Sequence, residues 1–533
     1  MNRGGAAVFF IVGLALLSSS YIFTKIAAMF VRFRKKFICI VFVLCCLNAG
    51  SQTCCCTEAF STLREYIKES YAGYELKMSD HSKEHDQFVN KLEKKVKDIP
   101  SFSVTCYKTL NEYIAFFEDG HLTLGLNLTG NTDSINQFYA QAERVAIPTD
   151  TFKSIINKPG NDPITGIWKE LDNDPETQFK LAIVPDKNKP GSFTGVLIAS
   201  VYKYWKPSSV MMKIIKNKKG YRITHYTSRG ANRYYDIELN SEKNAFSTQA
   251  RIWIKEDAKG LYPDSSAFKH LILTQETFFR ELSAQTNYLR LPVFFKGGEL
   301  IERIIDSNLE NIISKPYLVI DIRNNTGGTA NGFQKLLSYI SDTLPHFAQL
   351  DYLTKSSPAI IAGYEKFYKD IKRENEAGLK ILRDSVGKIF NWNAVQNKDG
   401  KTQSLSSSTE QLPNNIKKII VLQNRYVYSA AEIFVNIFSA SPKVHFMGTH
   451  TGGLIDKVAT MQLYPNIHGL FQLTVPVAVR IGAKEHPIDP IGFPPDIYYS
   501  SGEKDWVEQA RYLLENNLLP ALPQRFNTRK HGK

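Results

Sequence analysis

The pattern of apolar and polar positions divides the chain into segments of different periodicity. Over 57–117, apolar residues recur at helical spacing, as Phe60, Leu63 and Ile67 do, which predicts a small helical domain. Over 165–254, short runs rich in aromatic and β-branched residues are separated by glycine-containing turns. This second pattern predicts an antiparallel β domain of about six to eight strands.

The chain changes character again after Leu289. The run 316–322 is largely apolar, and a turn with two glycines and a helical stretch at 332–340 follow it. The run 416–422 repeats this arrangement and precedes a helical stretch at 429–439. Two strand–turn–helix units predict a largely parallel sheet, and a site is expected in the loops at the carboxyl ends of its strands.

These patterns predict a multi-domain α/β protein. With 533 residues and 43% hydrophobic composition, the chain has the length and the composition for several globular domains. We expect a targeting segment, a helical domain, an antiparallel β-rich domain, an α/β catalytic domain and a basic tail, at 1–51, 52–125, 126–288, 289–525 and 526–533.

The N-terminus has the pattern of a secretory signal. Basic residues at 32–36 precede an apolar run at 37–44, and small residues at 49–51 provide a cleavage site before Gln52. We therefore predict export to the periplasm or the cell envelope, with secretion as the alternative. An earlier apolar stretch at 6–30 leaves two interpretations open: Met29 is the true start, or the stretch is an uncleaved membrane anchor.

The formal net charge of +14 does not indicate nucleic-acid binding. Six basic residues precede the first acid, Glu58, and the other basic residues are scattered without a basic run or a nucleic-acid-binding motif. Of the seven cysteines, all except Cys106 lie within 39–56, so we expect no disulfide in the core. No spacing of histidine and cysteine predicts a metal site.

Two turns of the α/β part carry candidate chemistry. After the first strand, a glycine pair at 327–328 can adopt positive φ and direct unpaired N–H groups at an oxyanion. After the second strand, Ser429 lies at the junction with a helix, near the N–H groups of its first turn. Taken separately, the glycine pair is more typical of a tight turn, and the serine is more typical of a helix cap.

Together with two further motifs, these turns resemble the C-terminal-processing/tricorn family of serine peptidases. The motifs are Asp-Ile-Arg-Asn-Asn-Thr-Gly-Gly at 321–328, Ser-Ala-Ala-Glu-Ile-Phe at 429–434, Gly-Thr-His-Thr-Gly-Gly at 448–453 and Gly-Phe-Pro-Pro-Asp-Ile at 492–497. The resemblance covers about 289–499 and implies a crotonase-like α/β core. It implies a tail-specific serine peptidase that acts on polypeptides and uses no metal or organic cofactor.

The resemblance also implies roles for individual residues. Ser429 matches the nucleophile, which attacks a peptide carbonyl and forms an acyl-enzyme. The N–H of Ala430, with that of Gly327 or Gly328, would form the oxyanion hole. The sequence carries no indication of the oligomeric state.

The two branches of the family use different general bases. One branch has a lysine after its Thr-x-Gly motif, but that position is Leu454 here, and Lys457 lies three residues beyond it. The tricorn-like branch uses a histidine, and His121 in Asp-Gly-His-Leu-Thr at 119–123 resembles that element. A solitary histidine is more often a surface or capping residue, so this assignment depends on the other motifs.

A carboxylate usually orients a histidine base. The tricorn-like branch has an acidic residue shortly before its Gly-x-x-Pro-Asp motif, where Asp489 lies here, although the family more often has glutamate. Glu485 is the second candidate, and Glu432 is assigned to the helix start. Asp321 and Arg323 are expected to support the glycine turn without touching substrate.

A second class of function stays open at this point. The leucine at the lysine position and the aspartate at the glutamate position are both compatible with an inactive exported binding protein on a peptidase scaffold. A serine-directed phosphonate distinguishes the two classes, because only an active peptidase forms an adduct at Ser429.

Overall fold

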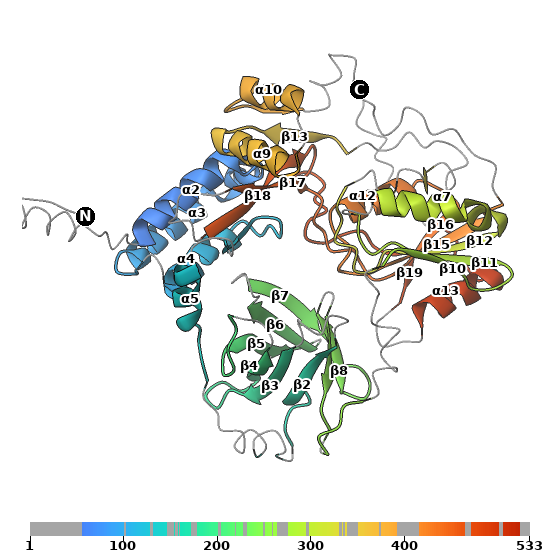
Figure 1. Cartoon of the computed structure of the whole chain (residues 1–533), viewed down its shortest axis with the longest axis horizontal. Helices are drawn as coiled ribbons and strands as arrows, with labels where there is room; N and C mark the ends of the chain where they lie inside the picture. The colour runs from blue at the N-terminus through green and yellow to red at the C-terminus, as the bar shows by residue number, and fades with distance from the viewer. Residues whose placement is uncertain are drawn as a thin grey trace, which may run out of the picture. The chain divides into compact units, whose positions relative to one another are not determined.

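Among the described residues, the computed structural model has three β-sheets (Figure 1). The described residues lie between Cys56 and Leu522, and the longer gaps among them are 146–153, 172–178, 264–275, 338–349, 392–414 and 464–470. The predicted segments 1–51 and 526–533, and most of the helical stretch expected at 332–340, lie outside the described residues. None of the helices in the described part is long and apolar enough to cross a membrane.

A six-stranded sheet forms the α/β part, in the order β10-β11-β12-β15-β16-β19. All neighbouring strands from β11 to β19 are parallel, and β10 is antiparallel to β11. The strands are β10 (Phe278–Glu281), β11 (Thr286–Arg290), β12 (Tyr317–Asp321), β15 (Lys418–Gln423), β16 (Val444–Gly448) and β19 (Ile497–Tyr498). The predicted parallel sheet is therefore confirmed.

Helices cover both faces of this sheet. They are α7 (Gly298–Ser314), α12 (Ala430–Phe438) and α13 (Trp506–Glu515). Successive side chains of a strand point to opposite faces. Leu318 and Ile320 of β12 accordingly pack in the core that includes α7 and α12, and Val319 packs in the core that includes α13. Burial on both faces explains why these strands are continuously apolar in the sequence.

A second sheet joins strands from distant parts of the chain, in the order β1-β18-β13-β14, with β17 also paired to β18. Its strands are β1 (Thr123–Leu126), β13 (Tyr352–Lys355), β14 (Ile389–Asn391), β17 (Lys457–Leu463) and β18 (Phe471–Arg480). Its helices are α2 (Cys56–Ser70), α3 (Tyr74–Val96), α4 (Val104–Ala115), α9 (Pro358–Asp370) and α10 (Glu376–Asp384). Thr123 of β1 is opposite Thr474 of β18, so the predicted helical domain shares a sheet with the C-terminal region.

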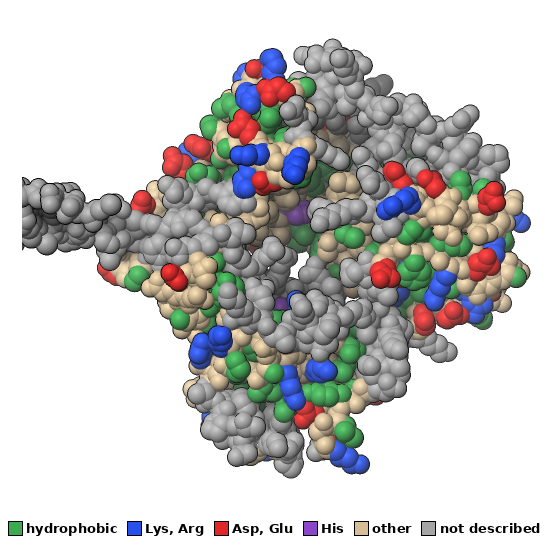
Figure 2. Space-filling view, in the orientation of Figure 1, with side chains coloured by type: hydrophobic (Ala, Val, Ile, Leu, Met, Phe, Trp, Pro, Cys, Tyr) green, Lys and Arg blue, Asp and Glu red, His purple; other side chains and the backbone are tan. Residues whose placement is uncertain are grey.

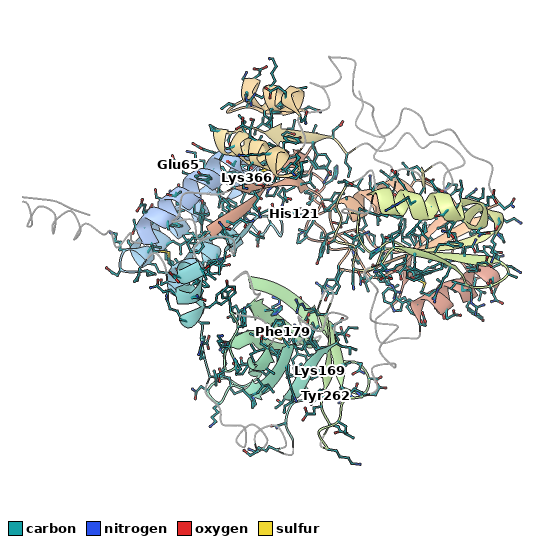
Figure 3. The ribbon with its side chains drawn as sticks, viewed as in Figure 1. Glu65, His121, Lys169, Phe179, Tyr262 and Lys366 are labelled. Atoms are coloured by element: carbon teal, nitrogen blue, oxygen red, sulfur yellow. A yellow bond between two sulfur atoms is a disulfide. The ribbon has the colours of Figure 1, made fainter. Side chains whose placement is uncertain are left out.

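The third sheet is antiparallel and has eight strands, in the order β7-β6-β5-β4-β3-β2-β9-β8. The strands are β2 (Gly166–Leu171), β3 (Phe179–Pro185), β4 (Ser192–Ser200), β5 (Val210–Asn217), β6 (Gly220–Tyr226), β7 (Asn232–Ile237), β8 (Ala245–Thr248) and β9 (Arg251–Lys255). The helix α5 (Thr132–Ala140) precedes them. The buried side chains of Trp168 and Trp253 lie in its core, and Figure 3 labels Lys169 and Tyr262 of this part. The predicted antiparallel β domain is confirmed.

A disulfide joins Cys56, the first residue of α2, to Cys106 in α4. The expectation of a core without a disulfide was therefore wrong. The sequence places Cys56 in a run with Cys54 and Cys55 behind the signal, but the fold begins a helix at Cys56 and packs it against α4. The pairing of cysteines depends on this packing and cannot be deduced from their spacing.

Replacement of both cysteines by serine is expected to lower the free energy of unfolding by about 4 kcal/mol, because the bridge closes a long loop in the unfolded chain. The two cysteines are separated by 50 positions in the sequence. Denaturant titration of the wild type and the Cys56→Ser/Cys106→Ser variant measures the difference. Equal unfolding midpoints for the two proteins would contradict the expectation.

Candidate active site

Ser429 occupies a strained turn between a strand and a helix. Strand β15 ends at Gln423, helix α12 starts at Ala430, and Ser429 between them is the N-cap residue with φ of 56° and ψ of −124°. A positive φ is unfavourable for a residue with a side chain and often marks a functional position. The half-buried serine lies at the positive end of the helix dipole, where negative charge is stabilised.

The glycine turn after β12 packs directly on this serine. Gly327 has φ of +95°, and a Cβ atom there would lie 2.9 Å from the Cβ of Ser429 and 2.9 Å from the nitrogen of Ala430. Only glycine permits both this conformation and this approach. The structure thus brings Gly327, Ser429 and Ala430 together, as the sequence predicted.

Asn325 connects the two turns. Its side-chain nitrogen donates to the backbone carbonyl of Leu291 over 2.9 Å. Its own backbone carbonyl accepts from the N–H of Tyr428 over 3.0 Å. Its side-chain oxygen accepts from the N–H of Gly327 over 2.8 Å. Because the N–H of Gly327 is engaged in this way, Gly328 is the glycine of the pair whose N–H has no acceptor among the described residues. The N–H of Ala430 has none there either.

A buried ionic cluster supports the glycine turn. Asp321 accepts from the guanidinium and the backbone N–H of Arg323, from Arg290 and from the hydroxyl of Tyr288, over 2.6 to 3.2 Å. Burial by itself would raise the pKa of Asp321, but the charges of Arg323 and Arg290 and its hydrogen bonds lower it to about 2. The cluster holds the end of β12, and these contacts are those of a supporting group.

His121 lies in the loop between α4 and β1 (Figure 3). Its backbone N–H donates to Asp119 over 2.8 Å, and Asp119 in turn accepts from the hydroxyl of Tyr71 over 2.9 Å. The ring nitrogen Nδ1 lies 2.7 Å from the carbonyl oxygen of Lys457. A carbonyl only accepts, so in neutral imidazole Nδ1 carries the hydrogen and Nε2 has the lone pair that a general base needs.

One buried carboxylate links Ser429 to the loop that contacts the histidine segment. Glu432 accepts from the N–H of Ser429 over 3.3 Å, Gly453 over 2.9 Å and Leu454 over 2.7 Å, and also from the hydroxyl of Thr451. Burial raises the pKa of Glu432, and these hydrogen bonds oppose the rise. Because all four partners donate, Glu432 acts as an acceptor that fixes the helix start, as its assignment to that position implies.

The side chain of Leu454 packs against Gly120, the residue before the histidine. A Cβ atom on Gly120 would lie 2.9 Å from the Cδ2 atom of Leu454. The residue at the position of the family lysine is therefore an apolar contact of the segment that carries His121. Through Leu454 and Glu432, the segments containing His121 and Ser429 meet at the same loop, 451–454.

Asp489 lies near these groups, but the hydrogen bond that the structure gives at Nδ1 of His121 is to Lys457. One oxygen of Asp489 accepts from the N–H groups of Ile455 and Asp456, over 2.7 and 3.1 Å. The other is buried without a hydrogen bond, 3.6 Å from Nζ of Lys457. Burial and the nearby Asp456 raise the pKa of Asp489 to about 7, against the opposing charge of Lys457.

Glu485, the second candidate for the acidic role, is exposed to solvent. The group at Nδ1 of His121 was missed by sequence reasoning, which considered Lys457 only as an alternative base. A main-chain carbonyl carries no residue-specific signal, so no motif could have indicated it.

The raised pKa of Asp489 makes stability depend on pH. An aspartate in an unfolded chain has a pKa of about 3.9, whereas the folded chain raises that of Asp489 to about 7. Between these pH values the folded state holds a proton that the unfolded state has lost. The contribution of Asp489 to the free energy of unfolding therefore falls as the pH rises, by up to about 1.4 kcal/mol per pH unit. Denaturant titration should show that Asp489→Asn gains stability relative to the wild type from about pH 4 to about pH 7 and that the difference levels off above this range. A constant difference across this range would contradict the expectation.

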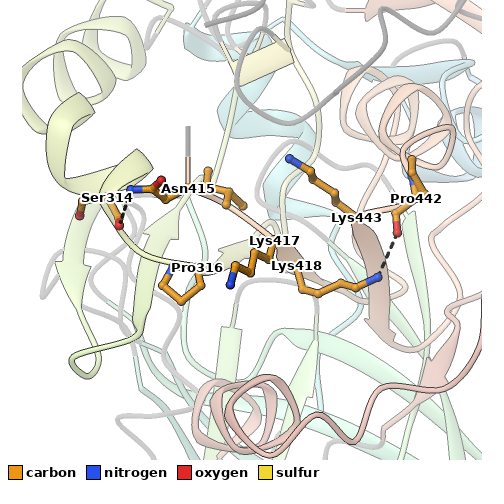
Figure 4. Close-up of a pocket in the computed structure, with 8 residues that line it drawn as sticks. Ser314, Pro316, Asn415, Lys417, Lys418, Pro442 and Lys443 are labelled. Atoms are coloured by element: carbon orange, nitrogen blue, oxygen red, sulfur yellow. Dashed lines mark hydrogen bonds between the residues drawn. The ribbon is translucent and has the colours of Figure 1, made fainter. Parts of the chain in front are cut away.

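An open pocket of about 760 Å³ lies away from this site, at the amino ends of β12, β15 and β16 (Figure 4). Its lining residues are Ser314, Pro316, Asn415, Ile416, Lys417, Lys418, Pro442 and Lys443.

Acidic and basic side chains are interspersed on the face shown in Figure 2. Within the described residues, no group of three or more histidine, cysteine, aspartate or glutamate side chains is arranged to hold a metal ion.

A strained serine at a strand-to-helix turn of a parallel α/β core, with a glycine turn packed on it, is an arrangement typical of serine hydrolases. Residues 285–499 match the family model described as peptidase family S41. This part of the chain is therefore similar to that family, in agreement with the resemblance seen in the motifs. No curated protein sequence matches the chain.

Several solved structures are similar to the chain at low sequence identity. Mature CPAF has a TM-score of 0.43 and 13% identity, over 88% of this chain and 98% of that chain. The photosystem II D1 C-terminal processing protease has a TM-score of 0.36 and 13% identity, over 88% of this chain and 99% of that chain. The tricorn protease has a TM-score of 0.36 and 13% identity, over 87% of this chain and 37% of that chain. The similarity to the peptidase family rests on the match at 285–499.

Proposed function

We propose that the chain is an exported serine peptidase of the tail-specific, tricorn-like kind, with Ser429 as nucleophile and His121 as general base. The observation that carries the proposal is the arrangement around Ser429: its positive φ of 56°, its place at the start of α12 and the close packing of Gly327 on it. These features suit a nucleophile whose oxyanion intermediate forms beside backbone N–H groups.

The mechanism follows from the groups already described. Nε2 of His121 takes the proton of Ser429 as the hydroxyl attacks a peptide carbonyl, and the acyl-enzyme forms when the leaving amine receives that proton. The N–H groups of Gly328 and Ala430, which have no acceptor among the described residues, would stabilise the oxyanion. Water then attacks the acyl-enzyme with His121 again as base.

Export is part of the proposal. The disulfide between Cys56 and Cys106 supports it, because such bonds form and persist in oxidising compartments. The basic and apolar pattern at 32–44 agrees with the same interpretation.

The alternative is a catalytically inactive exported protein that binds peptides or other ligands on the same scaffold. The observation that favours it is the carbonyl of Lys457 at Nδ1 of His121, where an active triad usually has a carboxylate.

The test is labelling of the purified chain, from Gln52 onward, with a fluorophosphonate, followed by mass spectrometry of the adduct. We expect one adduct, on Ser429, because the reagent reacts only with an activated serine. A folded, monodisperse sample that forms no adduct would reject the peptidase and favour the binding protein.

A further inference from the structure

Two buried aspartates hold together the segments on either side of the histidine contact. Asp489 accepts from the N–H groups of Ile455 and Asp456, over 2.7 and 3.1 Å. In the opposite direction, Asp456 accepts from the N–H groups of Ile488 and Asp489, over 2.8 and 2.9 Å. The four hydrogen bonds lock 455–456 to 488–489.

The two carboxylates differ in their cationic partners. Asp456 forms a short ion pair with Arg480, whose Nε lies 2.7 Å away. Asp489 is 3.6 Å from Nζ of Lys457, and its second oxygen has no hydrogen bond. The strongest contacts of Asp489 are therefore with the backbone, at the two residues that immediately precede Lys457.

Lys457 starts β17 and presents its carbonyl to the imidazole. Lys457 pairs with Val479 of β18, which holds it in the sheet. Asp489 holds the two residues before it, Ile455 and Asp456, through their backbone N–H groups. From this geometry we propose that Asp489 is a positioning residue, which holds 455–457 so that the Lys457 carbonyl accepts from Nδ1 of His121. The inference rests on the proposed function, because it assigns His121 the role of base.

The electrostatics agree with this role. A carboxylate that stabilises an imidazolium must be ionised when the histidine takes up its proton. Burial and the charge of Asp456 raise the pKa of Asp489 to about 7, so it is only partly ionised near neutral pH. A backbone-holding role needs an acceptor oxygen and no charge. Among the described residues, Asp456, Lys457, Tyr71 and Tyr352 are charged or titratable groups that interact electrostatically with Asp489.

The role predicts a specific order of variants. Asp489→Asn keeps an oxygen for the N–H groups of Ile455 and Asp456, so we expect its rate of fluorophosphonate labelling to stay within about threefold of the wild type, with the same pH profile. Asp489→Ala removes the acceptor, and we expect labelling to slow by about tenfold or more. Asp257→Asn is the matched control, since Asp257 accepts from two backbone N–H groups in a turn of the β domain.

Two labelling results would overturn the inference. A loss of about 10³-fold or more in Asp489→Asn would mean that the carboxylate acts on the imidazole itself, because an amide there selects the wrong tautomer. Unchanged labelling in Asp489→Ala would mean that Asp489 positions nothing. Thermal melting of each variant identifies any that fail to fold, and Asp489→Asn keeps the test decisive if Asp489→Ala does not fold.

A spectroscopic readout separates this inference from the proposed function. In a Ser429→Ala background with nitrogen-15-labelled histidine, the ring signals of His121 are identified by their loss in His121→Gln. We expect the Nδ1–H tautomer to persist in Asp489→Asn and to become mixed in Asp489→Ala. A tautomer that changes in Asp489→Asn, or persists in Asp489→Ala, contradicts positioning even if the wild type forms no phosphonate adduct.

Discussion

Replacement of Ser429 by alanine is expected to lower peptide hydrolysis by about 10⁵-fold or more, because the acyl-enzyme cannot form without the hydroxyl. The change deletes one atom of a half-buried residue and leaves in place the backbone contact that Gly327 makes with the turn. We therefore expect the melting temperature to change little. Hydrolysis of an unstructured polypeptide, followed by mass spectrometry, measures the loss.

Ser439→Ala is the matched control for this experiment. Ser439 caps the other end of the same helix, α12, so its replacement perturbs the helix without touching the nucleophile. The control should retain wild-type hydrolysis. Residual hydrolysis in Ser429→Ala at more than about a hundredth of the wild-type rate, in a preparation free of other peptidases, would reject Ser429 as the nucleophile.

Replacement of His121 by alanine is expected to have the second largest effect, a loss of at least about 10³-fold in the rate of hydrolysis, because it removes the base that takes the serine proton. The same variant should lose fluorophosphonate labelling to a similar extent. His81→Ala is a suitable control, since His81 lies on α3 with an exposed side chain that pairs with Glu84.

Lys457→Met distinguishes the two branches of the family. The variant removes the ammonium group but keeps the backbone carbonyl that lies 2.7 Å from Nδ1 of His121. If His121 is the base, we expect Lys457→Met to retain hydrolysis within about tenfold of the wild type. A loss as large as that of His121→Ala would transfer the role of base to the lysine.

Local sequence pattern was sufficient for the elements that carry the nucleophile. The apolar runs at 316–322 and 416–422 became β12 and β15, because strands buried on both faces need apolar residues at every position. The serine after the second run became the residue before α12, and the glycine pair after the first run became a turn with positive φ at both residues. These relations are short in sequence, so propensity and turn chemistry determine them.

The histidine side of the site was decided by tertiary structure. His121 and Lys457 are 336 positions apart, and they meet because β1, which follows His121, and β17, which starts at Lys457, both pair with β18. No local pattern encodes which distant strands pair. For the same reason, the disulfide between Cys56 and Cys106 depended on the packing of α2 against α4.

By itself, the sequence determined the strand–turn–helix units, the antiparallel β domain, and, through its motifs, the peptidase family and the place of Ser429. Only the tertiary structure decided which group meets the histidine ring and what Asp489 contacts. The physical reason is that side-chain type and local spacing are written in the sequence. The partner of a main-chain carbonyl or of a buried carboxylate is set instead by the packing of segments that are distant in the chain.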